Sequence, residues 1–397
     1  MGKKTFGNGF ILGLVAAIGL AVAGKAVATF CETTPFGRTV EYKLHKDVEN
    51  KINLLQDYVD QYYLDEVDEE ALKEGAYAGY IEAINDPYST YYTKQEYEDL
   101  LESSSGEYCG IGVAVTQDTE TKLITVVMVY DDTPAQKAGM KNEDILYKVE
   151  GEEIAGEEVD NVVTKIKGQE GTTVKITVYR PSTKEYIDME VERATIVMPT
   201  IEYKMLDEEN KIGYIQISQF DANTDEIFSD AMNDLMEQGM KSVVFDVRNN
   251  PGGIYDTVCN MLDELLPEGT LVYTLDKNGN KEEEKSDENC IDIPMVVLIN
   301  GNSASASEIF AGAIQDFEAG TIVGTQSFGK GVVQSVFSLE DGTALKLTIS
   351  KYYTPNGVNI HGKGITPDVE VEAAEVEDGE DEVSDPQMEK ALEILRK

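Results

Sequence analysis

Two short runs of uninterrupted apolar residues, Val-Val-Phe at 243–245 and Val-Val-Leu-Ile at 296–299, most constrain how this chain can fold. A strand that is apolar on both sides is typical of a parallel sheet covered by helices on both faces. Segments with helical spacing alternate with these runs from Lys211 onward, which is the element order of an α/β layer. The expected strands are 212–217, 242–247 and 295–300, and the expected helices are 224–239, 254–266 and 305–317. The second half of the chain is therefore predicted to be an α/β domain around a largely parallel sheet, followed by strands near 331–337 and 344–351.

The residues upstream of this domain form a compact block of strand and helix signals. The run Gly110-Ile111-Gly112-Val113 leads a strand, a second strand is expected at 123–130, and a final helix and strand at 159–166 and 173–179. This order resembles a PDZ domain, and the Gly-Ile-Gly-Val run lies where such domains carry their carboxylate-binding loop. Glycines expose backbone N–H groups that can bind a terminal carboxylate, and the neighbouring strand edge can accept an extended peptide. A Gly-x-Gly-x run alone is more often an ordinary turn, but the order of a whole domain predicts peptide binding by Gly110, Ile111, Gly112 and Val113.

The first thirty residues predict export. Lys3 and Lys4 precede an apolar stretch at 10–30 that only Lys25 interrupts, and its length is close to the roughly 20 residues that span a bilayer. A retained signal anchor is favoured, and a cleaved signal peptide stays open because small residues at 21–28 offer cleavage sites. Since basic flanks stay in the cytoplasm, we expect a single-pass cell-membrane protein with the rest of the chain outside the cytoplasm, or a secreted one if the segment is cleaved.

Two helices are expected between this segment and the PDZ domain, at 48–62 and 69–84. The first has apolar residues at alternating steps of three and four, which gives one apolar stripe. Such a helical pair fits either simple packing or a dimerisation arm, so a homodimer remains an open alternative.

The charge balance excludes several ligands. The chain has 33 Lys and Arg against 75 Asp and Glu, a formal net charge of −42, which would repel nucleic acid and anionic lipid headgroups. The acidic residues concentrate at 282–284 and 370–382, as in a solvated face or a tail. With four cysteines and two histidines and no metal-ligand spacing, no metal or cofactor is expected. A single Cys259–Cys290 disulfide stays open.

Three polar segments end strands or open helices in the α/β domain, where such folds assemble their sites. Ser305 lies between a buried strand and a helix, whose N-terminal N–H groups favour a developing negative charge. Lys330 lies in a glycine-flanked bend at 328–331, and Gly252-Gly253 closes a strand-to-helix turn. Each alone fits a simpler role: Ser305-x-x-Glu308 is a capping box, Lys330 suits a surface turn, and two glycines suit a loop. Their convergence on one α/β layer favours a site.

These segments resemble the signature motifs of the C-terminal processing peptidases, a family of PDZ-bearing serine proteases. The matching runs are Ser303-Ala304-Ser305-Ala306-Ser307-Glu308-Ile309, Phe328-Gly329-Lys330-Gly331-x-x-Gln334, Asp246-x-Arg248-x-Asn250-x-Gly252-Gly253 and Asp86-Pro87-Tyr88-Ser89-x-Tyr91. The resemblance implies that Ser305 is the nucleophile, Lys330 the base and Gln334 its support, in a protease domain of the crotonase/ClpP-like kind. It also implies protein substrates with a free, apolar C-terminus. Lys167 replaces an arginine that is frequent in the family's PDZ module.

The residue types favour a Ser-Lys mechanism on chemical grounds as well. A serine that attacks a peptide carbonyl needs a base, and a Ser-His-Asp triad would depend on His361 alone, because His45 precedes the first helix. A neutral lysine can serve instead, provided that burial beside neighbours such as Phe328 lowers its pKa from about 10.4 to roughly 7–8. Gln334 is four positions from Lys330 and would share one face of an extended strand with it.

The oxyanion of the reaction would be bound by the N–H of Ala306 together with that of Gly252 or Gly253. Ser327-x-x-Lys330 also satisfies the SxxK pattern of penicillin-binding enzymes, but that pattern needs a helix and two glycines flank the lysine. A non-catalytic exported PDZ scaffold, or a protease gated into an inactive state, remains the alternative function.

The predicted organisation is multidomain α+β. It comprises a signal anchor or signal peptide at 1–31, a helical N-terminal region at 46–105, a PDZ domain at 106–194, a serine protease domain at 195–372 and an acidic tail with a short C-terminal helix at 373–397.

Overall fold

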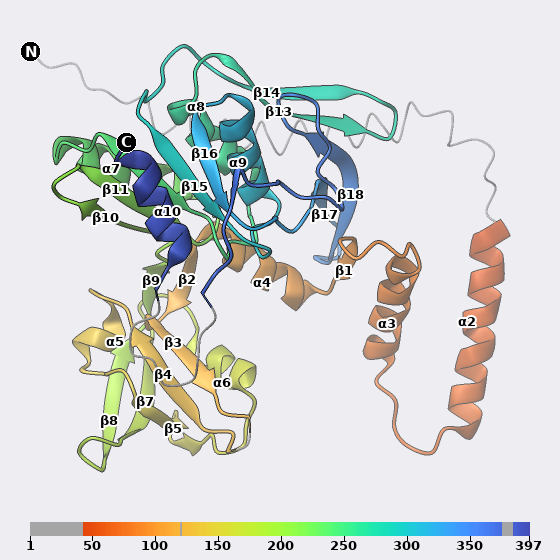
Figure 1. Ribbon diagram of the computed structural model, residues 1–397. Helices are drawn as coiled ribbons and strands as arrows, with labels where there is room; N and C mark the ends of the chain where they lie inside the picture. The colour runs from red at the N-terminus through yellow and green to blue at the C-terminus, as the bar shows by residue number, and fades with distance from the viewer. Residues whose placement is uncertain (1–42, 120, 375–383) are drawn as a thin grey trace, which may run out of the picture. The chain divides into compact units, whose positions relative to one another are not determined.

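The computed structural model describes residues 43–119, 121–374 and 384–397, and the chain divides into two compact units, 1–73 and 74–397 (Figure 1). The first unit contributes α2 (Lys43–Tyr62) and the start of α3 (Glu69–Glu82), so both helices expected before the PDZ domain are present. The carboxylate of Asp68 accepts hydrogen bonds from the N–H groups of Glu70 and Ala71 and caps α3. The apolar segment at 10–30 lies outside the described residues. Among those described, no helix has the length and apolar character needed to cross a membrane.

A tight turn follows α3 within the second unit. Asp86 accepts hydrogen bonds from the N–H of Tyr88 at 3.1 Å and from the hydroxyl of Ser89 at 2.6 Å. The strand β1 (Thr90–Tyr92) then pairs antiparallel with β18 (Ala344–Tyr353). Thr93 and Glu96 form a capping box at the start of α4 (Lys94–Ser105). The turn therefore brings residues that precede the PDZ domain beside a strand that follows it.

The PDZ domain is built on an antiparallel sheet in the order β3-β4-β5-β7-β8, with β6 paired to β5. These strands are β3 (Val113–Gln117), β4 (Ile124–Val129), β5 (Ile145–Val149), β6 (Glu152–Glu153), β7 (Thr173–Arg180) and β8 (Glu185–Glu192), with helices α5 (Pro134–Lys137) and α6 (Val159–Ile166). The expectation that the strand at 173–179 completes the domain is wrong, because β8 pairs with β7 along its whole length. Two further strands, β2 (Glu107–Gly110) and β9 (Ala194–Val197), pair with each other where the chain enters and leaves the domain.

The predicted protease domain has a six-stranded sheet in the order β10-β11-β12-β15-β16-β19, parallel apart from the β10–β11 pair. Its strands are β10 (Ile201–Asp207), β11 (Ile212–Ile217), β12 (Ser242–Asp246), β15 (Met295–Ile299), β16 (Gly320–Gly324) and β19 (Val369–Glu370). The helices α7 (Thr224–Glu237), α8 (Tyr255–Leu265) and α9 (Ala306–Asp316) contribute to the core on one face of the sheet. The predicted parallel α/β layer is confirmed.

The central strands of this sheet are buried on both faces, as their unbroken apolar runs require. Val243 and Phe245 belong to the core under α7, α8 and α9, whereas Val244 between them belongs to a second cluster. That second cluster is completed by Ala391 of the C-terminal helix α10 (Pro386–Leu395), which covers the opposite face (Figure 1). The alternation follows from the two-residue period of a strand.

A second, antiparallel sheet contains β17, the strand that directly follows Lys330. Its strands are β13 (Gly269–Asp276), β14 (Lys281–Ser286), β17 (Val332–Ser338), β18 and β1. The acidic run at 282–284 was expected to be a solvated face, and it forms an exposed edge strand, β14. Cys259 and Cys290 are free thiols, so the disulfide left open between them is not formed.

The loop after β12 is tied to α10 by one arginine. Arg248 donates to Asp246 at 2.6 Å and to Asp385, the N-cap residue of α10, at 2.9 Å. It also donates to the side-chain oxygen of Gln387 at 3.0 Å. Burial works against the guanidinium charge, yet the hydrogen bonds that Arg248 donates to Asp246 and Asp385 raise the pKa of Arg248 above its ordinary value. The strand end that leads to Gly252 and Gly253 is thereby fixed to the C-terminal helix.

Candidate active site

Ser305 occupies a strained position at the start of α9. It is the N-cap residue of the helix and has φ 56° and ψ −115°, a left-handed region that a non-glycine residue enters at a cost of about 1–3 kcal/mol. Such strain persists only where the surroundings fix the backbone, and it clusters at functional sites. The N–H of Ala306, the next residue, opens the helix and has no hydrogen-bond acceptor among the described residues. Ser305 therefore projects from a sharp strand-to-helix turn beside a free N–H donor.

Glu308 is 1% exposed, and its carboxylate contacts the backbone of Ser305. Its Oε2 accepts hydrogen bonds from the N–H of Ser305 at 2.9 Å and from the N–H of Lys330 at 2.8 Å. Its Oε1 accepts from the hydroxyl of Ser327 at 2.5 Å and from the N–H of Gly329 at 2.7 Å. The capping box predicted from Ser305-x-x-Glu308 is thus part of a larger network that includes the Lys330 segment.

Lys330 lies in the bend before β17, after Gly329 with φ 90°. Its side-chain nitrogen is 5.2 Å from the centre of the Tyr88 ring. Burial lowers the pKa of Lys330 below its ordinary value, and the positive charge of Lys346 lowers it further, against the opposing effect of the Glu308 carboxylate. We expected Phe328 to bury Lys330, and this expectation is wrong, because Phe328 is 57% exposed. Cover for the lysine comes instead from Tyr88, a residue that precedes the PDZ domain.

One cavity of about 400 Å³ collects most of the site residues predicted from the sequence. Ser305, Ala306, Lys330, Gln334 and Gly253 all line it. Its other walls are largely apolar, and they come from both sheets and the helices between them: Phe220, Ile254, Ile309, Val332, Val336 and Tyr352. A hydroxyl, an amine and backbone donors thus share one partly enclosed space in which a peptide bond could be held.

Gln334 lines the cavity, but the strand geometry that places it there differs from the one expected from the sequence. We expected Lys330 and Gln334 to share one face of a strand, but β17 begins only at Val332 and its pairing with β18 shifts between Val333 and Gln334. The side-chain amide of Gln334 donates to the hydroxyl of Thr348 on β18 at 3.3 Å. The strand-face argument for this pair is therefore wrong, although both side chains line the same cavity.

The two glycines after β12 differ in the availability of their N–H groups. The N–H of Gly252 donates to the side-chain oxygen of Asn250 at 2.8 Å, whereas that of Gly253 has no acceptor within the described part of the chain. A Cβ on Gly252 would lie 2.7 Å from the Cβ of Ser305, so only glycine allows the loop to approach the serine this closely. Of the two alternatives, only Gly253 has a free N–H donor, and it lines the same cavity as Ala306.

The rival residues are placed away from this chemistry. The hydroxyl of Ser327 is buried, donates to Glu308 and accepts from the N–H of Ile365 at 2.6 Å. Ser327 and Lys330 lie outside any helix, which the SxxK pattern requires. His361 does not line the cavity and stacks edge-on against Tyr88, with ring centres 6.3 Å apart. No group of three or more potential ligands in the described residues could hold a metal ion.

Four residues of the site were missed by the sequence analysis. Glu308 was given the role of a helix cap and was part of the family motif at 303–309, and Tyr88 was only part of the family motif at 86–91. Tyr352, which is 1% exposed, lies with its hydroxyl 2.6 Å from the carbonyl of Lys330 and 3.0 Å from that of Ser305. Lys346 lines the same cavity from β18. The motif at 86–91 was the available signal for Tyr88, because the hydroxyl of Ser89 accepts from the N–H of Thr348 at 3.1 Å and fixes this segment beside the site.

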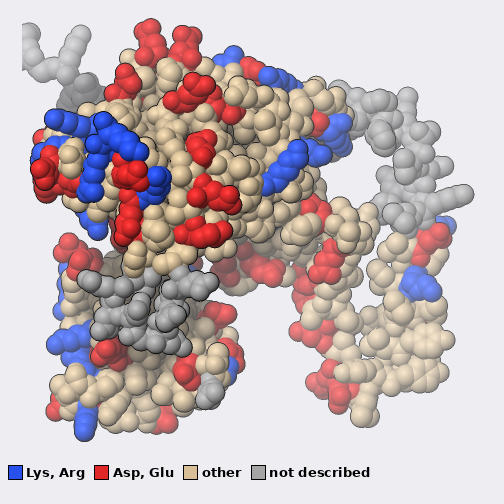
Figure 2. All heavy atoms as spheres, viewed as in Figure 1, with Lys and Arg blue, Asp and Glu red and all other residues tan. Residues whose placement is uncertain are grey.

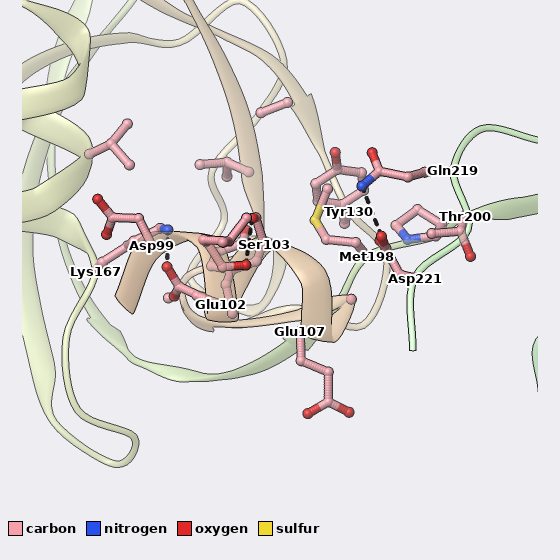
Figure 3. A pocket seen from close by; sticks show the side chains of 18 of the residues that line it. Asp99, Glu102, Ser103, Glu107, Tyr130, Lys167, Met198, Thr200, Gln219 and Asp221 are labelled. Carbon is pink, nitrogen blue, oxygen red and sulfur yellow. Dashed lines mark hydrogen bonds and ion pairs between the residues drawn. The ribbon is translucent and has the colours of Figure 1, made fainter. Parts of the chain in front are cut away.

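The predicted peptide-binding loop borders a second cavity of about 770 Å³ (Figure 3). Gly110, Ile111 and Val113 line it together with residues of α6, while Gly112, with φ 82°, faces Thr133 instead. Tyr108 also lines it. Burial raises the pKa of Tyr108 to about 12, against the opposing effect of hydrogen bonds from the loop N–H groups of Val113 and Gly112. These N–H groups are the donors that the sequence analysis assigned to a peptide carboxylate.

Lys167 lies at the end of α6, on the wall of the same cavity. It forms an ion pair with Glu102 of α4 at 2.5 Å, which Figure 3 shows beside Asp99 and Ser103. Lys167 also lies 5.4 Å from the centre of the Tyr108 ring. The lysine that replaces the expected arginine is thus held by an acidic residue of α4.

Sequence comparisons agree with this architecture. The model of peptidase family S41 matches residues 211–371, that of the PDZ domain matches 109–191, and that of the activating protease CtpB N-terminal domain matches 29–96. The fold and these matches define a serine peptidase with a PDZ domain.

Known relatives narrow this class. The chain is 35% identical over 373 residues to a carboxy-terminal-processing protease of Bartonella bacilliformis, which covers 91% of this chain and 82% of the relative. It is 37% identical over 304 residues to a CtpA-like serine protease of Staphylococcus haemolyticus, covering 76% of this chain and 60% of that protein. A solved photosystem II D1 C-terminal processing protease is 28% identical, with a TM-score of 0.49 over 81% of this chain and 86% of that one. The chain belongs to the C-terminal processing proteases of peptidase family S41.

Proposed function

We propose that this protein is an exported endopeptidase that captures protein substrates by a free C-terminus in its PDZ domain and cleaves them with Ser305 and Lys330. The observation that carries the catalytic part is the shared cavity, in which the hydroxyl of Ser305, the amine of Lys330 and the amide of Gln334 are brought together with two free N–H donors. The shortage of histidine and the position of His361 outside this cavity support a lysine base.

In the proposed reaction, the neutral amine of Lys330 takes the proton of Ser305 as its hydroxyl oxygen attacks the scissile carbonyl carbon. The carbonyl oxygen becomes negatively charged and accepts hydrogen bonds from the N–H groups of Ala306 and Gly253. The ammonium of Lys330 then returns the proton to the departing amine, which leaves an acyl-serine that water hydrolyses by the same two steps. Gln334 orients the lysine side chain from β17.

Substrate capture is proposed for the cavity at Gly110–Val113. A peptide that adds to the edge of β3 would bring its terminal carboxylate to the loop N–H groups that now face the Tyr108 hydroxyl. The apolar side chains along the cavity, including Val115, Val163 and Ile166, suit an apolar C-terminal residue.

The location of the protein is proposed from its first thirty residues. Lys3 and Lys4 before the apolar stretch at 10–30 support a signal anchor with the protease outside the cytoplasm. Acidic side chains are distributed over the surface in view (Figure 2), in keeping with protein rather than nucleic-acid partners. Protease digestion of intact cells, followed by detection of the catalytic domain, tests this location.

The catalytic proposal is tested by labelling the full chain with a fluorophosphonate probe and mapping the modified peptide. We expect the label on Ser305 and its loss in Ser305→Ala, with proteolysis abolished and the fold retained. Arginine keeps the charge of lysine but cannot release a proton at usable pH, so Lys330→Arg should lose about 10²–10⁴-fold in activity. Proteolysis that survives in Ser305→Ala, or a folded but inactive His361→Ala, would refute the Ser-Lys assignment.

A further inference from the structure

The Glu308 carboxylate is surrounded entirely by hydrogen-bond donors. Three of its four partners are backbone N–H groups, from Ser305, Gly329 and Lys330. The fourth, the Ser327 hydroxyl, already accepts a hydrogen bond from Ile365 and so directs its own proton to Glu308. A carboxylate has about four acceptor positions, and all of them are used. Glu308 therefore has no free lone pair to act as a base and no acceptor to which it could pass a proton.

Two of these donors belong to the proposed nucleophile and base. The same oxygen, Oε2, accepts from Ser305 at 2.9 Å and from Lys330 at 2.8 Å. On the carbonyl side, the hydroxyl of Tyr352 lies within hydrogen-bond distance of both residues. Tyr352 has one hydroxyl proton, which the carbonyl of Lys330 at 2.6 Å and that of Ser305 at 3.0 Å share, so the same two buried side chains contact the N–H and the C=O of each residue. This explains how Ser305 keeps φ 56°, since both of its peptide groups are fixed.

A residue that only caps a helix would require fewer hydrogen bonds than Glu308 accepts. The capping role of Glu308 is met by its bond to the N–H of Ser305 alone. The other three bonds reach the loop 327–330, which follows the next strand and is not part of the helix. Glu96 shows the simpler case, because within the described part of the chain its carboxylate accepts only from Thr93 at the N-cap of α4. The wider network of Glu308 is what joins the two segments of the site.

We propose that Glu308 is a positioning residue that fixes the distance between the nucleophile Ser305 and the base Lys330. This inference depends on the proposed function, in which these two residues react with each other. A shift of about 1 Å between reacting groups can reduce the rate about 10²-fold, so a single carboxylate that holds both backbones would have a large effect on turnover. The negative charge of Glu308 also stabilises the protonated form of Lys330 and thus opposes the effect of burial and of Lys346.

The test compares two substitutions of Glu308 in the full chain. Glu308→Gln keeps the shape, but its amide N–H groups would face two donors, so kcat should fall about 10²-fold while KM for a peptide with a free C-terminus changes little. Loss of the negative charge should also move the rising part of the pH–rate profile to lower pH. Glu308→Asp keeps the charge but is one methylene shorter, so kcat should fall with the profile left in place. Glu264→Gln is the matched control, because Glu264 also accepts from a serine, Ser229 at 2.7 Å, but lies outside the site.

Each result decides the inference. A folded Glu308→Gln or Glu308→Asp protein with kcat within threefold of the parent overturns the positioning role, and an unmoved pH profile in Glu308→Gln overturns the effect of its charge on Lys330. If Glu308→Gln does not fold, Tyr352→Phe decides, because it removes only the hydroxyl between the two carbonyl groups: a tenfold or greater loss of kcat supports the inference and parental kcat overturns it. Ser305→Ala separates this outcome from the failure of the proposed function. Activity that remains in this variant would show that Ser305 is not the nucleophile.

Discussion

The side-chain nitrogen of Lys330 lies 5.2 Å from the centre of the Tyr88 ring, although one residue follows the PDZ domain in sequence and the other precedes it. The aromatic face attracts the ammonium form, whereas the cover that the ring provides disfavours it by excluding water. The net result is a pKa of Lys330 below its ordinary value, with burial as the largest cause. The proposed base is therefore completed by the region before the PDZ domain.

Substitutions of Tyr88 should separate these two effects. In Tyr88→Ala the lysine gains water, the pKa of Lys330 should rise towards its ordinary value, and the rising part of the pH–rate profile should move to higher pH. In Tyr88→Leu the cover is kept but the aromatic face is lost, so the profile should move to lower pH. Profiles of kcat/KM for the two variants, with Tyr88→Phe as the control that keeps the ring, measure this. Shifts in the same direction for Ala and Leu would contradict the account.

Lys346 offers a test by charge alone. Its positive charge disfavours protonation of Lys330 and lowers the pKa of that lysine. Removing it in Lys346→Gln should therefore raise the pKa of Lys330, reduce the fraction of neutral amine at a given pH and move the rising part of the profile to higher pH. Lys346→Arg keeps the charge and should leave the profile in place. Low salt should enlarge the difference, since screening weakens interactions between charges.

The peptide-binding loop should depend on Gly112. Its φ is 82°, and a Cβ there would lie 2.4 Å from side-chain atoms of Thr133. Gly112→Ala should cost about 1–2 kcal/mol in stability because an L-residue is strained at this φ, and the displaced loop should bind a carboxylate poorly. We expect KM to rise for a peptide with a free C-terminus and to stay constant for its amidated counterpart. Gly156, with φ 83° and open space for a Cβ, is the control for backbone strain without a clash. Equal KM changes for both peptides would argue against carboxylate capture here.

Asp385 should stabilise the protein in a pH-dependent way. Burial raises its pKa, but the hydrogen bonds from Arg248 outweigh this, so the pKa of Asp385 lies below its ordinary value of 3.8. A carboxyl group whose pKa is lowered on folding stabilises the folded state above its unfolded pKa, and this stabilisation is lost as the pH falls through the folded value. Asp385→Asn keeps a good N-cap residue but loses the charge, and should cost about 1 kcal/mol at neutral pH. Urea unfolding should show that this difference disappears well below pH 3.8. A difference that persists in acid would assign the effect to capping.

The local sequence was sufficient for the elements whose side chains carry a clear period or a complete apolar run. The strands at 242–246 and 295–299 and the helix that follows Ser305 were predicted because burial on both faces leaves an uninterrupted apolar signature. The strand β14 was not, because five of its six residues are charged or exposed and its stability comes from backbone pairing with β13. Backbone hydrogen bonds leave no pattern in the side chains.

The sequence by itself determined the fold class and the order of the domains, and the resemblance of its motifs to the C-terminal processing peptidases singled out Ser305, Lys330 and Gln334 as candidates. All of these depend on residues that are close along the chain. Only the tertiary structure decided that Gly253 rather than Gly252 has a free N–H, that Tyr88 and not Phe328 covers the lysine, and that Glu308 joins the two halves of the site. The physical reason is the same in each case. A hydrogen bond or a contact between segments far apart in the chain depends on where the folded backbone brings them, and the residue type at either end does not reveal its partner.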